Sequence, residues 1–338
     1  MLTNPKLSSG DWVEVQSKEE ILRTLDTRGQ LEGLPFMPQM FQYCGKRFQV
    51  YKRAHKTCDT VNQTGGRRMV DTVHLELRCD GQAYGGCQAA CLLFWKTAWL
   101  KPADGPGPSP SHESTVNGSP VVDTSVIDRA TRAGESDQTE EKIRYSCQAT
   151  RMSEASSPLK RTDIRQYWKD LISGNVSLWT MIRYMPLAVF NTVIRKLGRD
   201  PIPFVKGVAG AKTPSEVLNL RPGELVEVKS AEEIMRTLDA NNGNRGLYFD
   251  EEMLPFCGKR YRVKERVDRL INDRSGAMIT MKTPGIILED VVCMGCYHPS
   301  RIFCPRGIYS FWREVWLRRV EEAPIPSSNG SLAEATAP

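Results

Sequence analysis

The chain has 338 residues, of which 40% are hydrophobic and 25% are charged, as in an ordinary soluble globular protein. Its formal net charge is +6 with both signs interleaved, so we expect neither a nucleic acid nor a membrane as a partner. This length predicts about two domains. The first residues contain no apolar run of signal-peptide length, which predicts a cytoplasmic protein. Ten cysteines in a reducing compartment indicate metal or redox chemistry and argue against disulfides.

The chain is a diverged tandem repeat. Residues 10–53 align without a gap with residues 223–266, and 22 of the 44 aligned positions are identical. Further on, FWKTAWLK at 94–101 corresponds to FWREVWLR at 311–318. We therefore predict two modules, at 10–101 and 220–321. A feature found in only one copy is a candidate for function.

Each module opens with an alternating run that predicts a strand, at 12–15 and at 225–228. Ser17 and Ser230 each begin an S-x-x-E capping box, so a short helix is expected after each. Further strands are expected after Cys-Gly-Lys-Arg and at 72–78 and 286–292. The opening G-D-x-V-x-V and the strand lengths are similar to those of SH3-like barrels. We therefore expect an α+β fold, mainly β, of two small SH3-like barrel modules, each with an inserted capped helix.

The segments between and after the modules differ in composition. Residues 102–123 are rich in Pro, Gly and Ser and predict a flexible linker. Residues 124–150 predict a short helix at 125–133 and a strand at 143–150 added to the first module. A helical hairpin is expected at 162–198, with its helices capped by Thr162 or Asp163 and by Ser177. Residues 322–338 are expected to be a disordered tail.

The second helix of that hairpin is the most hydrophobic segment of the chain. Arg183 and Pro186 interrupt it, and its apolar length is at the short limit of a membrane span. We expect this helix to be buried between the modules. The alternatives are a surface for a protein partner or self-association over 178–197, and a membrane-associated helix.

The cysteines differ most between the copies. Cys44 matches Cys257, and we interpret both as core thiols. Cys87 matches Cys304, and Cys79 matches either Cys293 or Cys296. Two cysteines have no counterpart, because Ile271 stands at the position of Cys58 and Ile308 at that of Cys91.

The first module thus contains four candidate metal ligands: Cys58, Cys79, Cys87 and Cys91. Cys87 and Cys91 would share one face of a helix if a helix began after Gly85-Gly86. Four thiolates suit a tetrahedral zinc ion, which we favour, or an iron–sulfur cluster. The sequence does not decide whether a second metal site is formed by Cys293, Cys296, His298 and Cys304.

The leading functional hypothesis is a metal-binding interaction or accessory protein. The first alternative is a thiol-dependent or iron–sulfur enzyme that uses Cys87 and Cys91 near His74, with His55 as another nearby histidine. The second is a nucleic-acid-binding protein. The sequence contains no phosphate-binding loop and no G-x-S-x-G or H-E-x-x-H motif.

Overall fold

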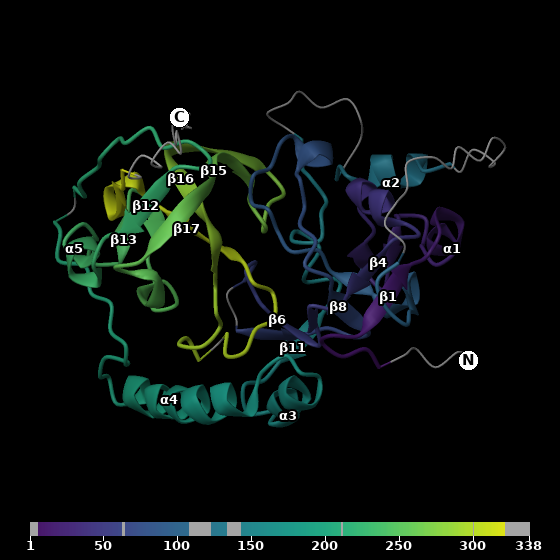
Figure 1. Cartoon of the computed structure of the whole chain (residues 1–338), viewed down its shortest axis with the longest axis horizontal. Coiled ribbons are helices and arrows are strands. Elements are labelled where there is room, and N and C mark those ends of the chain that lie inside the picture. Colours follow the sequence, from purple (N-terminus) through teal and green to yellow (C-terminus); the bar gives the residue numbers. More distant parts are fainter. Residues whose placement is uncertain are drawn as a thin grey trace, which may run out of the picture.

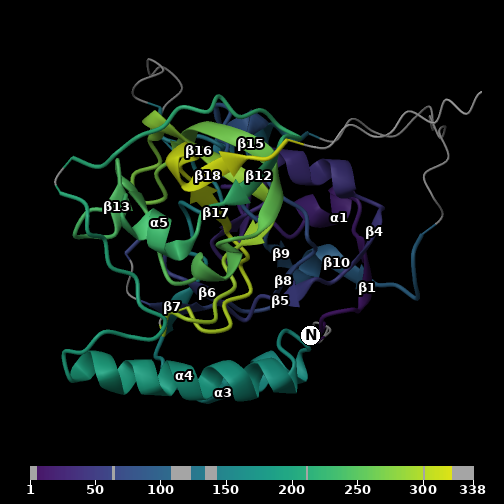
Figure 2. The ribbon, with the colours of Figure 1, turned by 60° about the vertical axis from the view of Figure 1, so that its left-hand side comes forward.

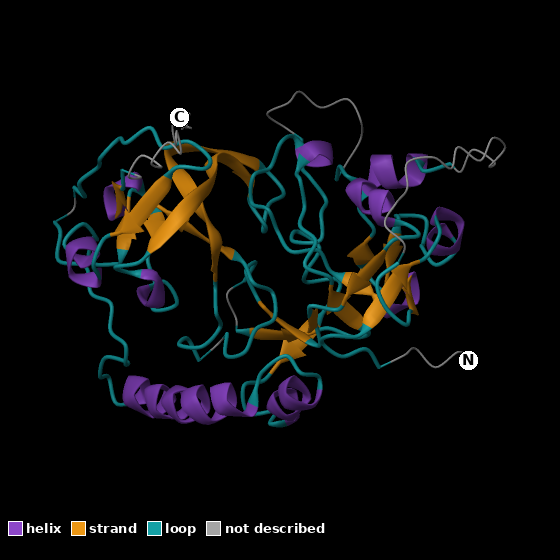
Figure 3. Cartoon of the chain, viewed as in Figure 1, coloured by secondary structure: helices purple, strands orange, loops and turns teal. Residues whose placement is uncertain are grey.

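The computed structural model describes residues 6–62, 65–107, 123–133, 143–210, 212–299 and 301–321. The protein is α+β and mainly β, as expected, with many short strands and few helices (Figure 3). The two modules lie side by side, the first in purple to blue and the second in green to yellow (Figure 1). The described strands form open sheets, and no closed barrel is found among them. Most of the predicted linker (108–122) and the predicted tail (322–338) lie outside the described residues.

The first module is built on a three-stranded sheet of order β10-β1-β4, in which β1 is Trp12–Val15, β4 is Arg47–Gln49 and β10 is Leu100–Pro102. Helix α1 (Lys18–Leu22) begins at the predicted capping box of Ser17. The other strands of this module are β2 (Gln30–Leu31), β3 (Leu34–Pro35), β5 (Lys52–Arg53), β6 (Lys56–Cys58), β7 (Gly66–Arg68), β8 (Thr72–His74) and β9 (Trp95–Lys96).

The second module repeats this order of elements. Strand β12 (Leu225–Val228) lies between β15 (Arg260–Ile271) and β18 (Leu317–Arg319), and helix α5 (Ala231–Met235) begins at the capping box of Ser230. The registers also correspond, since Val15 pairs with Leu100 and Val228 pairs with Leu317. The remaining strands are β13 (Gly243–Asn244), β14 (Leu247–Tyr248), β16 (Met278–Val292) and β17 (Tyr309–Trp312).

The modules differ most in one hairpin. In the second module β15 and β16 form a long hairpin that continues past its own sheet, and the side chains at its end, Ile271 and Met278, pack in the core of the first module. The corresponding hairpin of the first module, β6–β7, instead pairs with β11 (Ser157–Leu159). The β15–β16 hairpin therefore contributes to the core of the first module, and the β6–β7 hairpin contacts the second module where the Cys58 amide donates to the Cys304 sulfur.

The 162–198 segment forms two helices along one edge of the molecule (Figures 1 and 2). Helix α3 is Arg165–Ile172, and helix α4 is Leu178–Lys196 with Ser177 as its capping residue. One side of α4 packs on Ile302 and Phe303 of the second module. The opposite side is exposed, so the prediction that this helix is buried between the modules is wrong. No helix of the described chain is both long and apolar enough to cross a bilayer.

Three local predictions also need correction. Helix α2 is Ser125–Ala130 and ends before residue 133, and the strand predicted at 72–78 is only the short β8. Residues 143–150 form no strand of the first module. Instead, Arg144 bridges to Ala277 and the Tyr145 amide donates to the carbonyl of Gly276, both at the tip of the β15–β16 hairpin.

Candidate functional site

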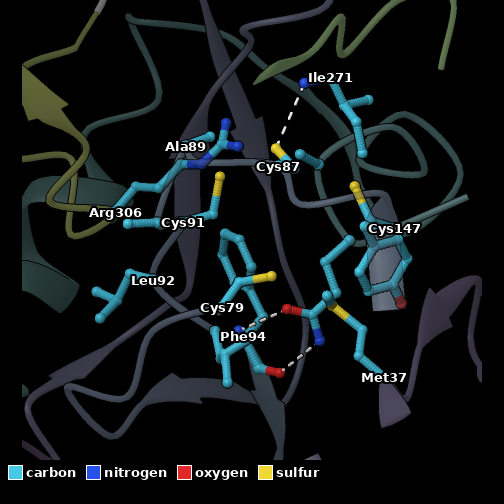
Figure 4. A pocket seen from close by; sticks show the side chains of 15 residues that line it. Met37, Cys79, Cys87, Ala89, Cys91, Leu92, Phe94, Cys147, Ile271 and Arg306 are labelled. Carbon is cyan, nitrogen blue, oxygen red and sulfur yellow. Dashed lines mark hydrogen bonds between the residues drawn. The ribbon is translucent and has the colours of Figure 1, made fainter. Parts of the chain in front are cut away.

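Four cysteine side chains line one cavity in the first module. Three of them, Cys79, Cys87 and Cys91, are ligands predicted from the sequence, and the fourth is Cys147 (Figure 4). The cavity has a volume of about 30 Å³, and its walls are otherwise mainly apolar. We call it the thiol cavity. Its other lining side chains include Met37, Phe94, Ile271 and Arg306.

Cys79 follows β8 in a loop whose shape depends on glycine. Its backbone amide donates to the carbonyl of Cys91 at 2.9 Å, which holds these two residues together. The Cys79 sulfur accepts from Gln39 Nε2 at 3.1 Å. Gly81 has φ +69°, and a Cβ there would collide with the carbonyl of Cys87. Only glycine therefore lets the chain turn this tightly between two of the cavity's cysteines.

No helix begins after Gly85-Gly86, so Cys87 and Cys91 do not share a helix face. Gln88, between them, is held by the hairpin of the second module. Its amide donates to the carbonyl of Arg269, and its side-chain oxygen accepts from the amides of Asp268 and Arg269. These contacts hold the loop extended along β15, because its backbone bonds are made to another strand and not within a helical turn.

Cys147 is the ligand candidate that sequence reasoning missed. The available signal was a shared triplet, because Cys87-Gln88-Ala89 and Cys147-Gln148-Ala149 both read Cys-Gln-Ala. In both triplets the backbone amide two residues after the cysteine acts to lower the thiol pKa, against the larger effect of burial, which raises it. Cys79 receives the same contribution from Gly81. A backbone amide therefore favours the thiolate form at three of the four cysteines of the thiol cavity.

Burial nevertheless dominates the electrostatics of the cavity. It raises the pKa of Cys79 to about 12 and also raises the pKa values of Cys87, Cys91 and Cys147. The guanidinium of Arg306, which is 2% exposed, opposes this effect at Cys91. The four thiols are therefore neutral near pH 7 unless a cation enters. A thiophilic metal ion would displace the protons, and the directed amides would then stabilise the thiolates.

Cys58, the remaining predicted ligand, lies elsewhere. It lines a different cavity together with Cys304, and its amide donates to the Cys304 sulfur at 3.3 Å. The structure therefore brings three of the four predicted ligands together and separates the fourth. Among the described residues, no three His, Cys, Asp or Glu side chains are already close enough to bind one metal ion.

The other candidate metal ligands and candidate bases lie outside the thiol cavity. The amides of Cys296 and His298 both donate to the carboxylate of Glu252, and this contact orders the loop before Cys304. His74 does not line the thiol cavity, and its Nδ1 lies 2.9 Å from the carbonyl of Leu93. His55 contacts Asp170, with 3.3 Å between Nε2 and Oδ1. No described histidine lines the thiol cavity, where it could act as a base for Cys87 or Cys91.

Comparisons of this chain with protein-family models, with curated proteins and with solved structures give no match.

Proposed function

We propose that the protein is a metal-binding accessory protein and that its thiol cavity holds a thiolate-bound metal centre. The observation that carries this proposal is the convergence of Cys79, Cys87, Cys91 and Cys147, from three segments of the chain, on one small cavity. All four thiols are partly buried, and Cys79, Cys87 and Cys147 also pack against the core of the first module. Backbone amides that favour the thiolate form of three of these cysteines would also stabilise thiolates bound to a metal.

Two kinds of centre suit four thiolates. A zinc ion binds sulfur at about 2.3 Å and would require the cysteine side chains to turn further into the cavity. An iron–sulfur cluster has a larger core and holds its thiolates further apart. Zinc is the metal expected from the sequence. An iron–sulfur cluster is the second candidate, because it too is held by cysteine thiolates.

The position of the cavity favours an accessory role. Both Ile271 and Arg306 belong to the second module, yet they line a cavity whose four cysteines lie outside that module. The Ile271 amide also donates to the Cys87 sulfur at 3.4 Å. A bound metal would fix the contact between the modules, because it stabilises the loops against which the second hairpin packs.

We further propose that each module is a diverged SH3-like fold and that the protein is cytoplasmic. The first proposal is supported by the matching sheets and registers of β1 and β12. The second is supported by the ten cysteines, all of which are free thiols.

The decisive experiment is metal analysis of the purified full-length protein with absorption spectroscopy. Stoichiometric zinc in a colourless protein, or iron with sulfide and visible absorbance, would support the proposal and identify the centre. Cys147→Ser and Cys91→Ser should each release the metal. Cys44→Ser and Cys58→Ser, which alter thiols outside the cavity, should retain it.

The variants also separate the two ligand sets. Loss of metal in Cys58→Ser with retention in Cys147→Ser would show that the set predicted from the sequence is correct and that the thiol cavity is not the site. A protein that contains no metal after anaerobic purification, and that binds neither zinc nor a reconstituted cluster, would overturn the proposal altogether.

A further inference from the structure

Helix α4 exposes a continuous apolar face. The positions of Ile182, Pro186, Val189, Val193 and Leu197 repeat at intervals of three and four residues, so these side chains share one side of the helix. Leu178, Trp179 and Phe190 widen this face, and Trp179 is 80% exposed. Only the opposite side of α4, at Ala188 and its neighbours, packs on the second module.

Helix α3 extends this surface. Ile164, Trp168 and Ile172 are spaced by four residues and are all exposed, with Trp168 at 65%. Figures 1 and 2 place α3 beside the end of α4, on the same edge of the molecule. We call the exposed apolar side chains of α3 and α4 the apolar edge. An apolar surface of this extent on a soluble domain indicates an interaction site.

The charge around the apolar edge identifies the kind of partner. Residues 160–200 contain eight basic and three acidic side chains, a net charge of 8 − 3 = +5 out of +6 for the whole chain. Of the three acidic side chains, Asp170 is buried and Asp163 is paired with Arg68 and Arg165. The basic residues of this segment are Lys160, Arg161, Arg165, Lys169, Arg183, Arg195, Lys196 and Arg199.

We propose that α3 and α4 dock the protein on an anionic membrane surface. A helix that lies in the bilayer interface has an apolar face rich in Trp, Phe and Leu, flanked by Lys and Arg that attract acidic headgroups. The apolar edge has both features, and its exposed Trp168 and Trp179 are residues that favour the headgroup region. The helix would lie along the surface, with the modules on the aqueous side. This proposal does not depend on the metal centre.

Flotation of the full-length protein with lipid vesicles tests this proposal. The protein should float with vesicles that contain phosphatidylglycerol and much less with vesicles of phosphatidylcholine alone, and high salt should weaken binding. Val189→Glu should weaken binding by about tenfold or more, since an aliphatic side chain contributes at least that much when buried. Lys169→Glu with Lys196→Glu should abolish the preference for the acidic lipid.

Val217→Glu is the matched control, because Val217 is 72% exposed but lies outside α3 and α4. All these side chains are exposed, so unchanged melting temperatures should show that the variants fold. The proposal is overturned if the wild-type protein floats with neither vesicle, or if Val189→Glu and Val217→Glu bind equally. It is also overturned if the protein fails to bind vesicles and forms a dimer that Val189→Glu dissociates.

Discussion

Thr60 Oγ1 donates a hydrogen bond of 2.6 Å to Asp273 Oδ2, and these two residues occupy the same position in the two copies, 213 residues apart. Equivalent residues contact each other only where two copies are related by an approximate two-fold axis. A second pair of contacts agrees with this. The amide of Cys58 donates to the sulfur of Cys304. In the other direction, the amide of Ile271 donates to the sulfur of Cys87. Ile271 is the counterpart of Cys58, and Cys87 is the counterpart of Cys304. The modules are therefore joined by reciprocal hairpins.

The first prediction concerns this axis. Thr60 also accepts from Arg306 Nη1 at 2.9 Å, and Arg306 Nη2 lies 3.8 Å from Asp273. Asp273→Ala should therefore lower the free energy of unfolding by about 1–3 kcal/mol, because the buried guanidinium loses its counter-charge. A double-mutant cycle with Thr60→Ala should show a coupling of at least about 0.5 kcal/mol in urea unfolding. Additive effects would mean that the contact between the copies does not form in solution.

The second prediction concerns Cys58 and Cys304, which line one cavity, with the Cys58 amide 3.3 Å from the Cys304 sulfur. The neighbouring Cys58 thiol lowers the pKa of Cys304. Two neighbouring cysteine side chains can form a disulfide when an oxidant is supplied. Diamide, which accepts two electrons and two protons, should produce a peptide linked between residues 58 and 304 in mass spectra of the digested protein. Cys304→Ser is the control without this link. Cross-links of Cys58 to other cysteines would contradict the arrangement.

The third prediction uses a hydrogen bond that both modules share. Trp99 Nε1 donates to Thr24 Oγ1 at 3.0 Å, and Trp316 Nε1 donates to Thr237 Oγ1 at 2.8 Å. Thr24→Val and Thr237→Val should each cost about 1–3 kcal/mol, because a buried indole N–H loses its acceptor. Guanidinium unfolding monitored by circular dichroism would measure this cost.

The other indole pair provides the control for packing. Within the described residues Trp95 Nε1 and Trp312 Nε1 have no hydrogen-bond partner. Trp95→Phe and Trp312→Phe thus report the loss of packed volume alone. Threonine variants with no measurable effect would show that the indole of Trp99 or Trp316 finds another acceptor.

The fourth prediction concerns a buried ion pair that joins three parts of the chain. Lys56 Nζ lies 2.5 Å from Asp170 Oδ2 of α3 and donates to the carbonyl of Ile302 at 2.9 Å. Both side chains are almost completely buried, and burial lowers the pKa of Lys56. Lys56→Met should cost about 3–5 kcal/mol, because Asp170 would remain buried without a cation.

Replacement of both partners provides the comparison. Lys56→Met with Asp170→Leu removes both charges and should destabilise the protein less than Lys56→Met alone. Urea unfolding of the two variants tests this order. A double variant that is less stable than the single variant would show that the ion pair itself, and not the cost of an unpaired charge, stabilises the docking of α3.

The fifth prediction concerns pH. Burial lowers the pKa of His74 from 6.5 to about 3, and its ring packs on Phe94 with 4.4 Å between the centroids. The folded protein therefore keeps the ring neutral, while the unfolded chain binds a proton below pH 6.5. Stability from this group is complete above pH 6.5 and is lost as the pH falls toward 3, by about 2 kcal/mol at pH 5.

Unfolding free energies between pH 7 and pH 5 test this prediction. His74→Asn lacks the titrating ring, so its stability should depend less on pH over this range than that of the wild-type protein. His298, whose pKa is lowered to about 4, accounts for part of the dependence that remains. Equal slopes in the wild-type protein and His74→Asn would contradict the assignment.

Local features could be predicted from the sequence because they depend on residues close together in the chain. The capping boxes at Ser17 and Ser230 form as expected, since their donors and acceptors are three residues apart. Ser177 caps α4, and Gly198 ends it with φ +70°. The repeat itself was visible because half of the aligned positions are identical. Three of the four thiols in the cavity were also named from the sequence.

The long-range arrangement was decided only by tertiary structure. Cys147 enters the thiol cavity because residues 143–150 pair with the tip of the β15–β16 hairpin, a contact that no local pattern encodes. Cys58 lies outside the thiol cavity because the β6–β7 hairpin places this residue beside Cys304. The apolar side of α4 stays exposed because the helix packs on Ile302 and Phe303 through its opposite side. The sequence shows which side chains are hydrophobic and favour nonpolar surroundings. Whether such a side chain is buried within this protein depends on the packing of segments that are far apart in the chain.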